Sequence, residues 1–326
     1  MTPDQDEKTP QEGLTKGGRF FFNLFWSTSQ ALADAAGSDR AWELIKPYLK
    51  LHFDAATQML KDKFKLKTDD LYSLAVFLNY FNMFSGIILS NHNFFEHGYI
   101  TDIHYCPFAN LSEVYCRFSG EYSNELIMQA INSGYEVIYT RKLVRGDPLC
   151  QLMVSKKGHT IWGEVAKKPV EIPIPHWSDE EREYWQSAAF SQSWIYETNA
   201  LVDFAGKEKA VEILRPYMKA LGKSIALDLS KELGIGNRDA ISIASIIEQC
   251  NQAANQKGEY IIHTPGRVEK ELTECIFANA SQDICADALE ARSNGICEMI
   301  NPEYEFRTIK RMCKGDKTCH WIIKKK

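Results

Sequence analysis

The second half of this chain repeats the first, and this repeat constrains the fold more than any other feature of the sequence. An offset of 169 residues places Phe21 on Phe190 and aligns the rest of the chain to its last residue without a gap. The aligned halves share about 33 identities over roughly 137 positions, whereas chance at ordinary composition gives fewer than about ten. The period is far longer than the roughly 20–50 residues of a stacking repeat. Each copy is therefore predicted to be a domain.

The alignment sets the expected domain boundaries. A flexible N-terminal tail is predicted over residues 1–20, a first domain over 21–157, a linker over 158–189 and a second domain over 190–326. The linker contains Pro173-Ile174-Pro175, which favours extended backbone.

Composition excludes several classes of function. A net charge of −5 provides no basic field for nucleic acid. No run of about 18 apolar residues is present, so no membrane-spanning helix is expected. The apolar stretch after the charged leader is too short for a secretory signal, which predicts a cytoplasmic protein with reduced thiols.

The two aligned copies predict one shared order of elements: three helices, a hairpin, a helix and a second hairpin. The three helices are expected at 21–36, 41–63 and 71–84, and again at 190–205, 210–232 and 240–253. Hairpins are expected at 87–95 with 99–105 and at 135–143 with 149–155, with a helix over 109–130 between them; the second copy's first hairpin is expected at 260–263 with 267–273. Helices that precede antiparallel strands indicate an α+β domain rather than a parallel α/β sheet.

Several residues are typical of helix starts. Ser178 followed by Glu181 has the form of a capping box and predicts a helix at this point. Thr68 or Asp69, and Asn237 in the second copy, are candidate N-caps of the third helix.

The cysteines carry the strongest chemical signal. The chain has nine, and six of them form pairs across the repeat: Cys106 with Cys275, Cys116 with Cys285, and Cys150 with Cys319. The unmatched Cys250, Cys297 and Cys313 stand opposite apolar residues, so they are expected to be small core hydrophobes.

Three interpretations of the matched cysteines remain open. Three thiolates per copy approach the ligand count of a zinc site, with Asp147 or Asp316 as an oxygen ligand, although no close Cys-x-x-Cys pair is present. Cys106 and Cys275 precede a predicted helix, where a thiol is activated as a nucleophile. Buried apolar thiols are the third interpretation. A matched histidine base is missing, because His104 pairs with Thr273.

The matched Gly146-Asp147 and Gly315-Asp316 steps are expected to be turn residues at the tip of the last hairpin. No glycine-rich phosphate loop or serine-nucleophile motif is present, so no nucleotide cofactor is expected.

The cysteine pattern resembles that of a known family. Cys106-Pro107-Phe108-Ala109, then Cys116, Arg141, Gly146 and Cys150, is similar to the L-2-amino-thiazoline-4-carboxylate hydrolase-like family. In the second copy Cys275, Phe277-Ala278, Cys285, Gly315 and Cys319 follow this pattern, with Lys310 in place of Arg141. The closing hairpin more distantly resembles 4-vinyl-reductase-type domains, which implies that α+β fold with the two copies packed as a pseudo-dimer.

The resemblance implies a hydrolase for a carbon–nitrogen bond, other than a peptide bond, in a small heterocyclic or amidine-type substrate. A thiolate or a metal-bound water would attack the electrophilic carbon. Cys106 and Cys275 would be nucleophile or ligand, Asp147 and Asp316 would support them, and Arg141 would bind a substrate carboxylate. The metal set would be the matched cysteines: Cys106, Cys116, Cys150, Cys275, Cys285 and Cys319.

A second function stays open beside the hydrolase: a zinc-stabilised protein that binds or senses a small molecule without catalysis. Either function needs a small-molecule partner, with no nucleic acid and no membrane. The chain is expected to be a monomer acting as a pseudo-dimer, or a homo-oligomer. Arg141 and His104, which the second copy lacks, favour the first copy as the more complete site.

Overall fold

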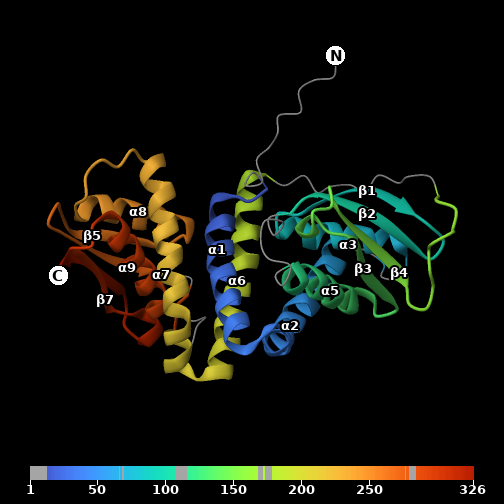
Figure 1. Ribbon diagram of the computed structural model, residues 1–326, viewed down its shortest axis with the longest axis horizontal. Helices are drawn as coiled ribbons and strands as arrows, with labels where there is room; N and C mark the ends of the chain where they lie inside the picture. Colours follow the sequence, from blue (N-terminus) through green and yellow to red (C-terminus); the bar gives the residue numbers. More distant parts are fainter. Residues whose placement is uncertain are drawn as a thin grey trace, which may run out of the picture. The chain divides into compact units, whose positions relative to one another are not determined.

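The fold is described from a computed structural model, which covers residues 13–65, 67, 70–106, 116–167, 172, 178–275, 277–278 and 284–326. The protein is α+β, with two compact units that each hold a four-stranded antiparallel sheet. Unit 1 comprises residues 1–15 and 45–189, and unit 2 comprises residues 16–44 and 190–326. Figure 1 labels the elements along the chain.

Unit 1 contains most of α2 (Ser38–Phe64), then α3 (Leu71–Phe84), the strands β1 (Ile88–Phe94) and β2 (Gly98–Tyr105), a π-helical segment (Cys116–Glu121), α5 (Tyr122–Asn132), and the strands β3 (Tyr135–Arg141) and β4 (Cys150–Lys156). The strand order is β1-β2-β4-β3, and every neighbouring pair is antiparallel. The helices α3 and α5 pack on strands of this sheet and on each other. Their apolar side chains, such as Phe77, Leu78 and Leu126, are buried and form a core with Tyr99 and Leu152.

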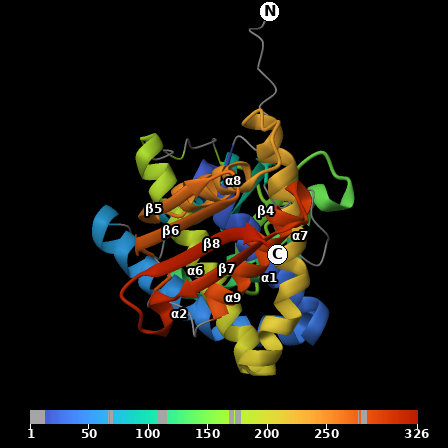
Figure 2. The same ribbon diagram turned by 90° about the vertical axis from the view of Figure 1, so that its left-hand side faces the viewer.

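Unit 2 contains α1 (Lys16–Ala36), the C-terminal part of α6 (Asp179–Ala205), α7 (Lys207–Glu232), α8 (Ala240–Ala253), β5 (Lys257–Thr264), β6 (Arg267–Glu274), α9 (Ile284–Ile300), β7 (Tyr304–Lys310) and β8 (Cys319–Lys325). The strand order is β5-β6-β8-β7, which Figure 2 shows with the sheet facing the viewer. One core joins Ile243 and Ile247 of α8, Ile296 of α9, and Val268 and Ile323 of the sheet.

The register of the first sheet recurs in the second at the sequence offset. Gly98 pairs with Ser155 between β2 and β4, and Arg267 pairs with Lys324 between β6 and β8. Both residues of the second pair lie 169 positions after those of the first, so equivalent residues pair in the two sheets. The predicted element order is found in both copies: three helices, a hairpin, a helix and a hairpin.

Helix starts agree with the sequence at one position and differ at others. Ser178 and Glu181 exchange hydrogen bonds of 2.9 and 3.2 Å, so the predicted capping box is confirmed. The cap of α8 is Asp239 rather than Asn237, because its carboxylate accepts from the Ser242 amide at 2.9 Å.

The cap of α3 is likewise an aspartate. Asp70 accepts from the Ser73 amide at 2.8 Å, whereas the candidates Thr68 and Asp69 lie outside the described residues. A carboxylate satisfies a free N–H and favours the positive end of the helix dipole, which explains why both copies use Asp here.

The first helix does not belong to the compact unit of the copy that encodes it. Residues 16–44 cluster with unit 2, although the sequence repeat assigns residues from 21 onward to the first copy. Helix α1 also begins at Lys16, within the segment expected to be a tail, and Phe20 is buried. Unit 2 therefore contains the equivalent helices of both copies, α1 and the C-terminal part of α6.

Candidate functional site

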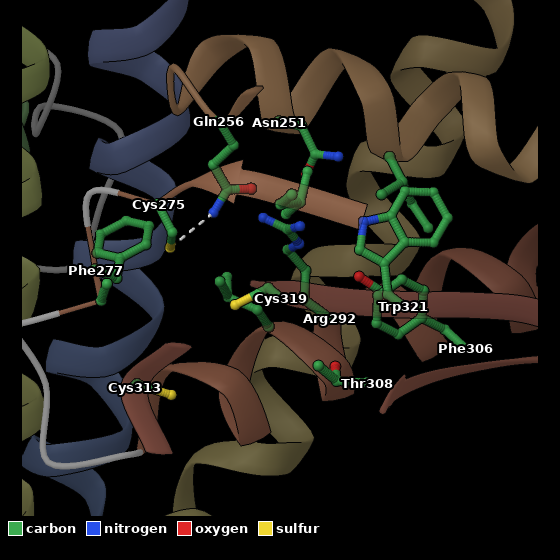
Figure 3. Close-up of a pocket in the computed structure, with 15 residues that line it drawn as sticks. Asn251, Gln256, Cys275, Phe277, Arg292, Phe306, Thr308, Cys313, Cys319 and Trp321 are labelled. Carbon is green, nitrogen blue, oxygen red and sulfur yellow. Dashed lines mark hydrogen bonds between the residues drawn. The ribbon is translucent and has the colours of Figure 1, made fainter. Parts of the chain in front are cut away.

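A pocket lies in unit 2, between α8, α9, the end of β6 and the strands β7 and β8. Its empty volume is about 570 Å³, part of which is open to solvent at the mouth. Three cysteines line it, together with apolar side chains such as Ile247, Leu272 and Phe306. Figure 3 shows Cys275 and Cys319 facing the same space. A concave, mostly apolar site with a few polar groups suits a small molecule.

Cys275 is held in an environment that favours its thiolate. It follows β6 directly and is half-buried. Its sulfur accepts from the thiol of Cys319, from the backbone N–H groups of Phe277 and Ala278, and from the Gln256 amide at 3.4 Å. Led by the Cys319 contact, these donors outweigh the opposing effect of burial and lower the pKa of Cys275 to about 6. Cys275 is therefore largely ionised at neutral pH.

Cys319 is the protonated partner of this pair. It begins β8, and its sulfur accepts from the Met312 amide at 3.2 Å. The hydrogen bond to the Cys275 sulfur, followed by burial, raises the pKa of Cys319 well above its usual value. Cys275 has more N–H donors than Cys319, which decides which sulfur carries the charge. The site thus holds one thiolate beside one thiol.

Aromatic side chains fix the backbone that cradles Cys275. Phe277 is fully buried and packs edge-to-face on Phe21 of α1, with ring centroids 5.7 Å apart. It also packs on Trp194 of α6, with centroids 4.8 Å apart. The Trp194 indole donates to Thr28 of α1 at 2.9 Å. Helices α1 and α6 therefore anchor the segment whose N–H groups point at the thiolate.

Buried hydrogen-bond donors without a partner among the described residues also line the pocket. Arg292, Asn251 and Trp321 are 3%, 4% and 3% exposed and line the pocket. The Nε and Nη1 atoms of Arg292, the Nδ2 atom of Asn251 and the Nε1 atom of Trp321 have no hydrogen-bond partner among the described residues. The Arg292 guanidinium lies 5.2 Å from the Phe20 ring centroid and points toward the middle of the pocket in Figure 3.

Unpartnered buried donors indicate the ligand that the pocket suits. Each one costs about 1–3 kcal/mol when left unsatisfied. All four unsatisfied atoms are donors, and one group is a cation. Such a lining is complementary to an anionic group, a carboxylate in particular, because the guanidinium fork matches two oxygens.

The equivalent positions of unit 1 are filled and hydrogen-bonded. Tyr139 stands where unit 2 has Thr308, and its hydroxyl accepts from Asn124 at 2.8 Å. Asn82, the counterpart of Asn251, donates to the Leu78 carbonyl at 2.8 Å and to Asn124 at 3.3 Å. The Asn82 amide is thus hydrogen-bonded within unit 1, whereas the Nδ2 atom of its counterpart Asn251 has no partner among the described residues.

The first copy's cysteines surround Tyr139. Burial raises the pKa of Tyr139 well above its usual value, and the neighbouring thiols of Cys106, Cys116 and Cys150 add to this. Cys150 accepts from the Leu143 amide at 3.1 Å, as Cys319 does from Met312, and burial raises its pKa. In the second copy the side chain of the third matched cysteine, Cys285, lies outside the described part of the structure.

The other predicted site residues serve the turn or face solvent. Asp147 accepts from the Lys142 amide at 2.8 Å, and Asp316 from the Arg311 amide at 2.7 Å, so each closes the connection before the last strand. Arg141 is exposed on β3. The predicted carboxylate partner is thus on the surface, while the guanidinium of the pocket is Arg292.

The unmatched cysteines divide into two groups. Cys250 and Cys297 are buried, and burial raises the pKa of both, that of Cys297 to about 12. Their expected role as core residues agrees with this burial. Cys313 is half-buried and lines the pocket, so its expected place in the core is wrong. The short 3₁₀ turn Met312–Lys314 presents it to the pocket instead.

The described residues contain no group of three or more His, Cys, Asp or Glu side chains arranged to hold a metal ion. The donor set that zinc requires is therefore not met in this part of the chain. The zinc site stays a prediction, because it includes Cys285.

Arg292, Gln256, Asn251 and Trp321 were not predicted as site residues. A signal was present in the repeat: Arg292, Gln256 and Trp321 stand opposite Ser123, Ile87 and Leu152. At these positions the second copy has polar or large side chains where the first copy has small or apolar ones.

No family model, no curated protein and no solved structure matches this chain. Among the described residues, no helix combines the length and the apolar character needed to cross a membrane.

Proposed function

We propose that unit 2 is a cysteine-dependent hydrolase that cleaves a carbon–nitrogen bond, other than a peptide bond, in a small anionic molecule. One observation carries this proposal: the hydrogen-bonded Cys275 thiolate opens onto a pocket whose buried donors have no partner. A lowered pKa and N–H donors at the sulfur are the features of an activated thiol. The cysteine pattern that resembles the L-2-amino-thiazoline-4-carboxylate hydrolase-like family supports the same chemistry.

The site residues divide the work in this proposal. Arg292, with Asn251 and Trp321, binds the anionic end of the substrate and fixes its orientation. The Cys275 thiolate attacks the carbon of the C=N or C–N group. The Cys319 thiol, which keeps its proton beside the charged sulfur, donates it to the nitrogen. The C–N bond breaks as the nitrogen takes this proton; water then attacks the carbon, displaces Cys275 as a thiolate and returns a proton to Cys319.

We propose that unit 1 supports the fold and is not a second active site. Its pocket positions are occupied by Tyr139, by Asn124, which donates to the Tyr139 hydroxyl, and by Asn82, which donates to Asn124. This reverses the ranking that Arg141 and His104 favoured. The recurring strand register supports a duplicated 4-vinyl-reductase-like domain, with the two copies acting as a pseudo-dimer in one chain.

The test uses 2-amino-thiazoline-4-carboxylate and related cyclic amidine carboxylates as substrates, with product release followed by mass spectrometry. Cys275→Ser is expected to lower the rate by about 10³-fold or more, because the nucleophile is lost. Cys106→Ser, the matched change in unit 1, is expected to leave the rate within about twofold. Equal losses in both variants, or turnover by Cys275→Ser at the wild-type rate, contradict the proposal.

The alternative function, binding or sensing without catalysis, is favoured by the unpartnered donors, since these bind and do not react. Under the hydrolase proposal Cys275→Ser loses turnover, whereas a sensing protein has no turnover to lose. Calorimetry with the same compounds separates them: binding with no turnover in the wild type supports sensing. Metal analysis of the same sample tests the zinc that this alternative includes.

A further inference from the structure

We propose that Cys275 and Cys319 form a hydroperoxide-reactive dithiol, in which Cys275 is oxidised and Cys319 closes a disulfide with it. The inference adds an activity and a modification site to unit 2. It concerns thiol chemistry alone and does not depend on the proposed hydrolysis.

The two sulfurs line the same pocket and face the same space in Figure 3. Cys319 pairs with Leu272 in the β6–β8 register, and the chain runs three residues beyond Leu272 to reach Cys275. Each of the two thiols shifts the pKa of the other through a side-chain contact, so the two side chains lie close to each other. Both are free thiols in the structure.

The surroundings admit a small oxidant. Cys275 and Cys319 are half-buried rather than sealed, and both line the open pocket. Arg292 lines the same space and has unpartnered N–H groups. A guanidinium that lines the same pocket can stabilise the negative charge that develops on the leaving oxygen of a hydroperoxide.

The chemistry proceeds in two balanced steps. The Cys275 thiolate attacks one oxygen of hydrogen peroxide, the O–O bond breaks, and Cys275 becomes a sulfenic acid while hydroxide leaves. The Cys319 thiol then attacks the sulfenic sulfur, the S–S bond forms, and its proton leaves with the hydroxyl group as water. Two electrons pass from the thiol pair to the peroxide, and reduction by an external thiol restores the pair.

The structure also sets the order of these steps. Cys319 holds its proton because the neighbouring sulfur of Cys275 carries the negative charge. Oxidation converts that thiolate into a neutral sulfenic acid and removes the charge. Cys319 then loses its proton more readily and becomes the attacking sulfur. Cys275 therefore reacts first, and Cys319 resolves.

The experiment treats the full chain with hydrogen peroxide, blocks the remaining thiols with N-ethylmaleimide and maps disulfides by peptide mass spectrometry without reductant. The wild type is expected to lose two of its nine free thiols and to yield a Cys275–Cys319 peptide pair. In Cys319→Ser, dimedone is expected to trap a sulfenic acid on Cys275. Cys106→Ser is the matched control and is expected to form the same disulfide as the wild type.

Three results overturn the proposal. One is a disulfide that joins Cys313 to either partner in place of the Cys275–Cys319 pair. Another is oxidation of Cys275 to sulfinic acid in the wild type with no disulfide. The third is unchanged loss of two thiols in Cys275→Ser. The mapping on the wild type needs no variant to fold and no substrate, so failure here is distinct from failure of the proposed hydrolysis.

Discussion

Cys275 illustrates how neighbouring donors set the chemistry of one side chain. Its sulfur accepts from two backbone N–H groups, an amide and a thiol, which lowers its pKa to about 6. The thiolate therefore dominates above this pH and is lost as the pH falls through it. The rate of alkylation by iodoacetamide is expected to be half-maximal near pH 6. Peptide mapping of the labelled protein between pH 4 and 9 measures this midpoint.

Removing one donor tests the cause of that low pKa. Gln256→Leu deletes the amide that lies 3.4 Å from the sulfur, so the alkylation midpoint is expected to move to higher pH. The matched control is Gln252→Leu, a change on the exposed face of α8 that should leave the midpoint in place. A midpoint unmoved by Gln256→Leu would show that the amide does not hold the thiolate.

Arg292 is expected to lower the stability of the folded protein, while its guanidinium is needed to bind a ligand. A buried cation with unpartnered N–H groups is unfavourable, so Arg292→Met should raise the free energy of unfolding by about 1–3 kcal/mol. The same change should abolish binding of a carboxylate ligand in the pocket. Urea denaturation and calorimetry measure the two effects. Arg238→Met, at an exposed arginine, should alter stability by less than about 0.5 kcal/mol. A clear loss of stability in Arg292→Met contradicts the assignment of an unpaired charge.

At the residue scale, the sequence singled out two cysteines that line the pocket and missed the polar side chains beside them. Matched positions identified Cys275 and Cys319, because a duplicated domain retains the residues it uses. Arg292 and Trp321 could not be found this way, since their matches are Ser123 and Leu152. Whether such a side chain is buried without a partner depends on packing in three dimensions, which spacing along the chain does not show.

At the element scale, helix α6 places an acid where ionisation is unfavourable. Glu197 is 1% exposed; one carboxylate oxygen accepts from Ser29 of α1, and the other has no partner among the described residues. Burial raises its pKa well above the usual glutamate value of 4.5. The folded state thus keeps the proton that the unfolded state loses, and stability falls as the pH rises above 4.5.

Glu197→Gln is expected to remove this pH dependence. Relative to the wild type, the variant should gain up to about 1.4 kcal/mol for each pH unit above 4.5, until the pH reaches the raised pKa. Below pH 4.5 the two proteins should be equally stable. Urea denaturation across pH 4 to 8 measures the difference, with Glu180→Gln on the exposed first turn of α6 as control. A constant difference at every pH would mean that Glu197 is ionised in both states.

The elements themselves were the part of the fold most open to prediction. The helices at 71–84 and 240–253 agree with α3 and α8, because apolar periodicity and breakers recur in both copies. The predicted N-cap Asn237 was wrong. Several polar residues precede this helix, and the path of the backbone decides which of their side chains reaches a free N–H group. The prolines at 47 and 216 lie inside continuous helices. Pro216 is in α7, which packs extensively along α9 and is therefore held by tertiary contacts.

At the scale of the whole molecule, the repeat predicted two similar units but not which helix each unit uses. Helix α1 belongs to the first copy by sequence and to unit 2 by its contacts. Equivalent helices from the two copies carry matching apolar patterns, so either one fits either position as far as sequence is concerned. The place of α1 in unit 2 is fixed by specific contacts. Phe21 packs on Phe277, and Asp34 accepts a hydrogen bond of 2.6 Å from the Tyr217 hydroxyl.

This placement predicts that the second copy cannot form its site alone. A fragment of residues 179–326 lacks α1 and exposes Trp194 and Phe277, so it is expected to unfold without cooperativity and to lack a thiol that reacts at pH 6 to 7. Adding a peptide of residues 16–44 should restore both properties, because it returns the aromatic contacts behind the Cys275 cradle. The same peptide with Phe21→Ala should restore them poorly, since a buried phenylalanine contributes about 3–5 kcal/mol. Circular dichroism and iodoacetamide labelling follow the two properties. If the fragment alone folds and its Cys275 is alkylated with a midpoint near pH 6, the site is complete without α1, and the helix serves only to link the two copies.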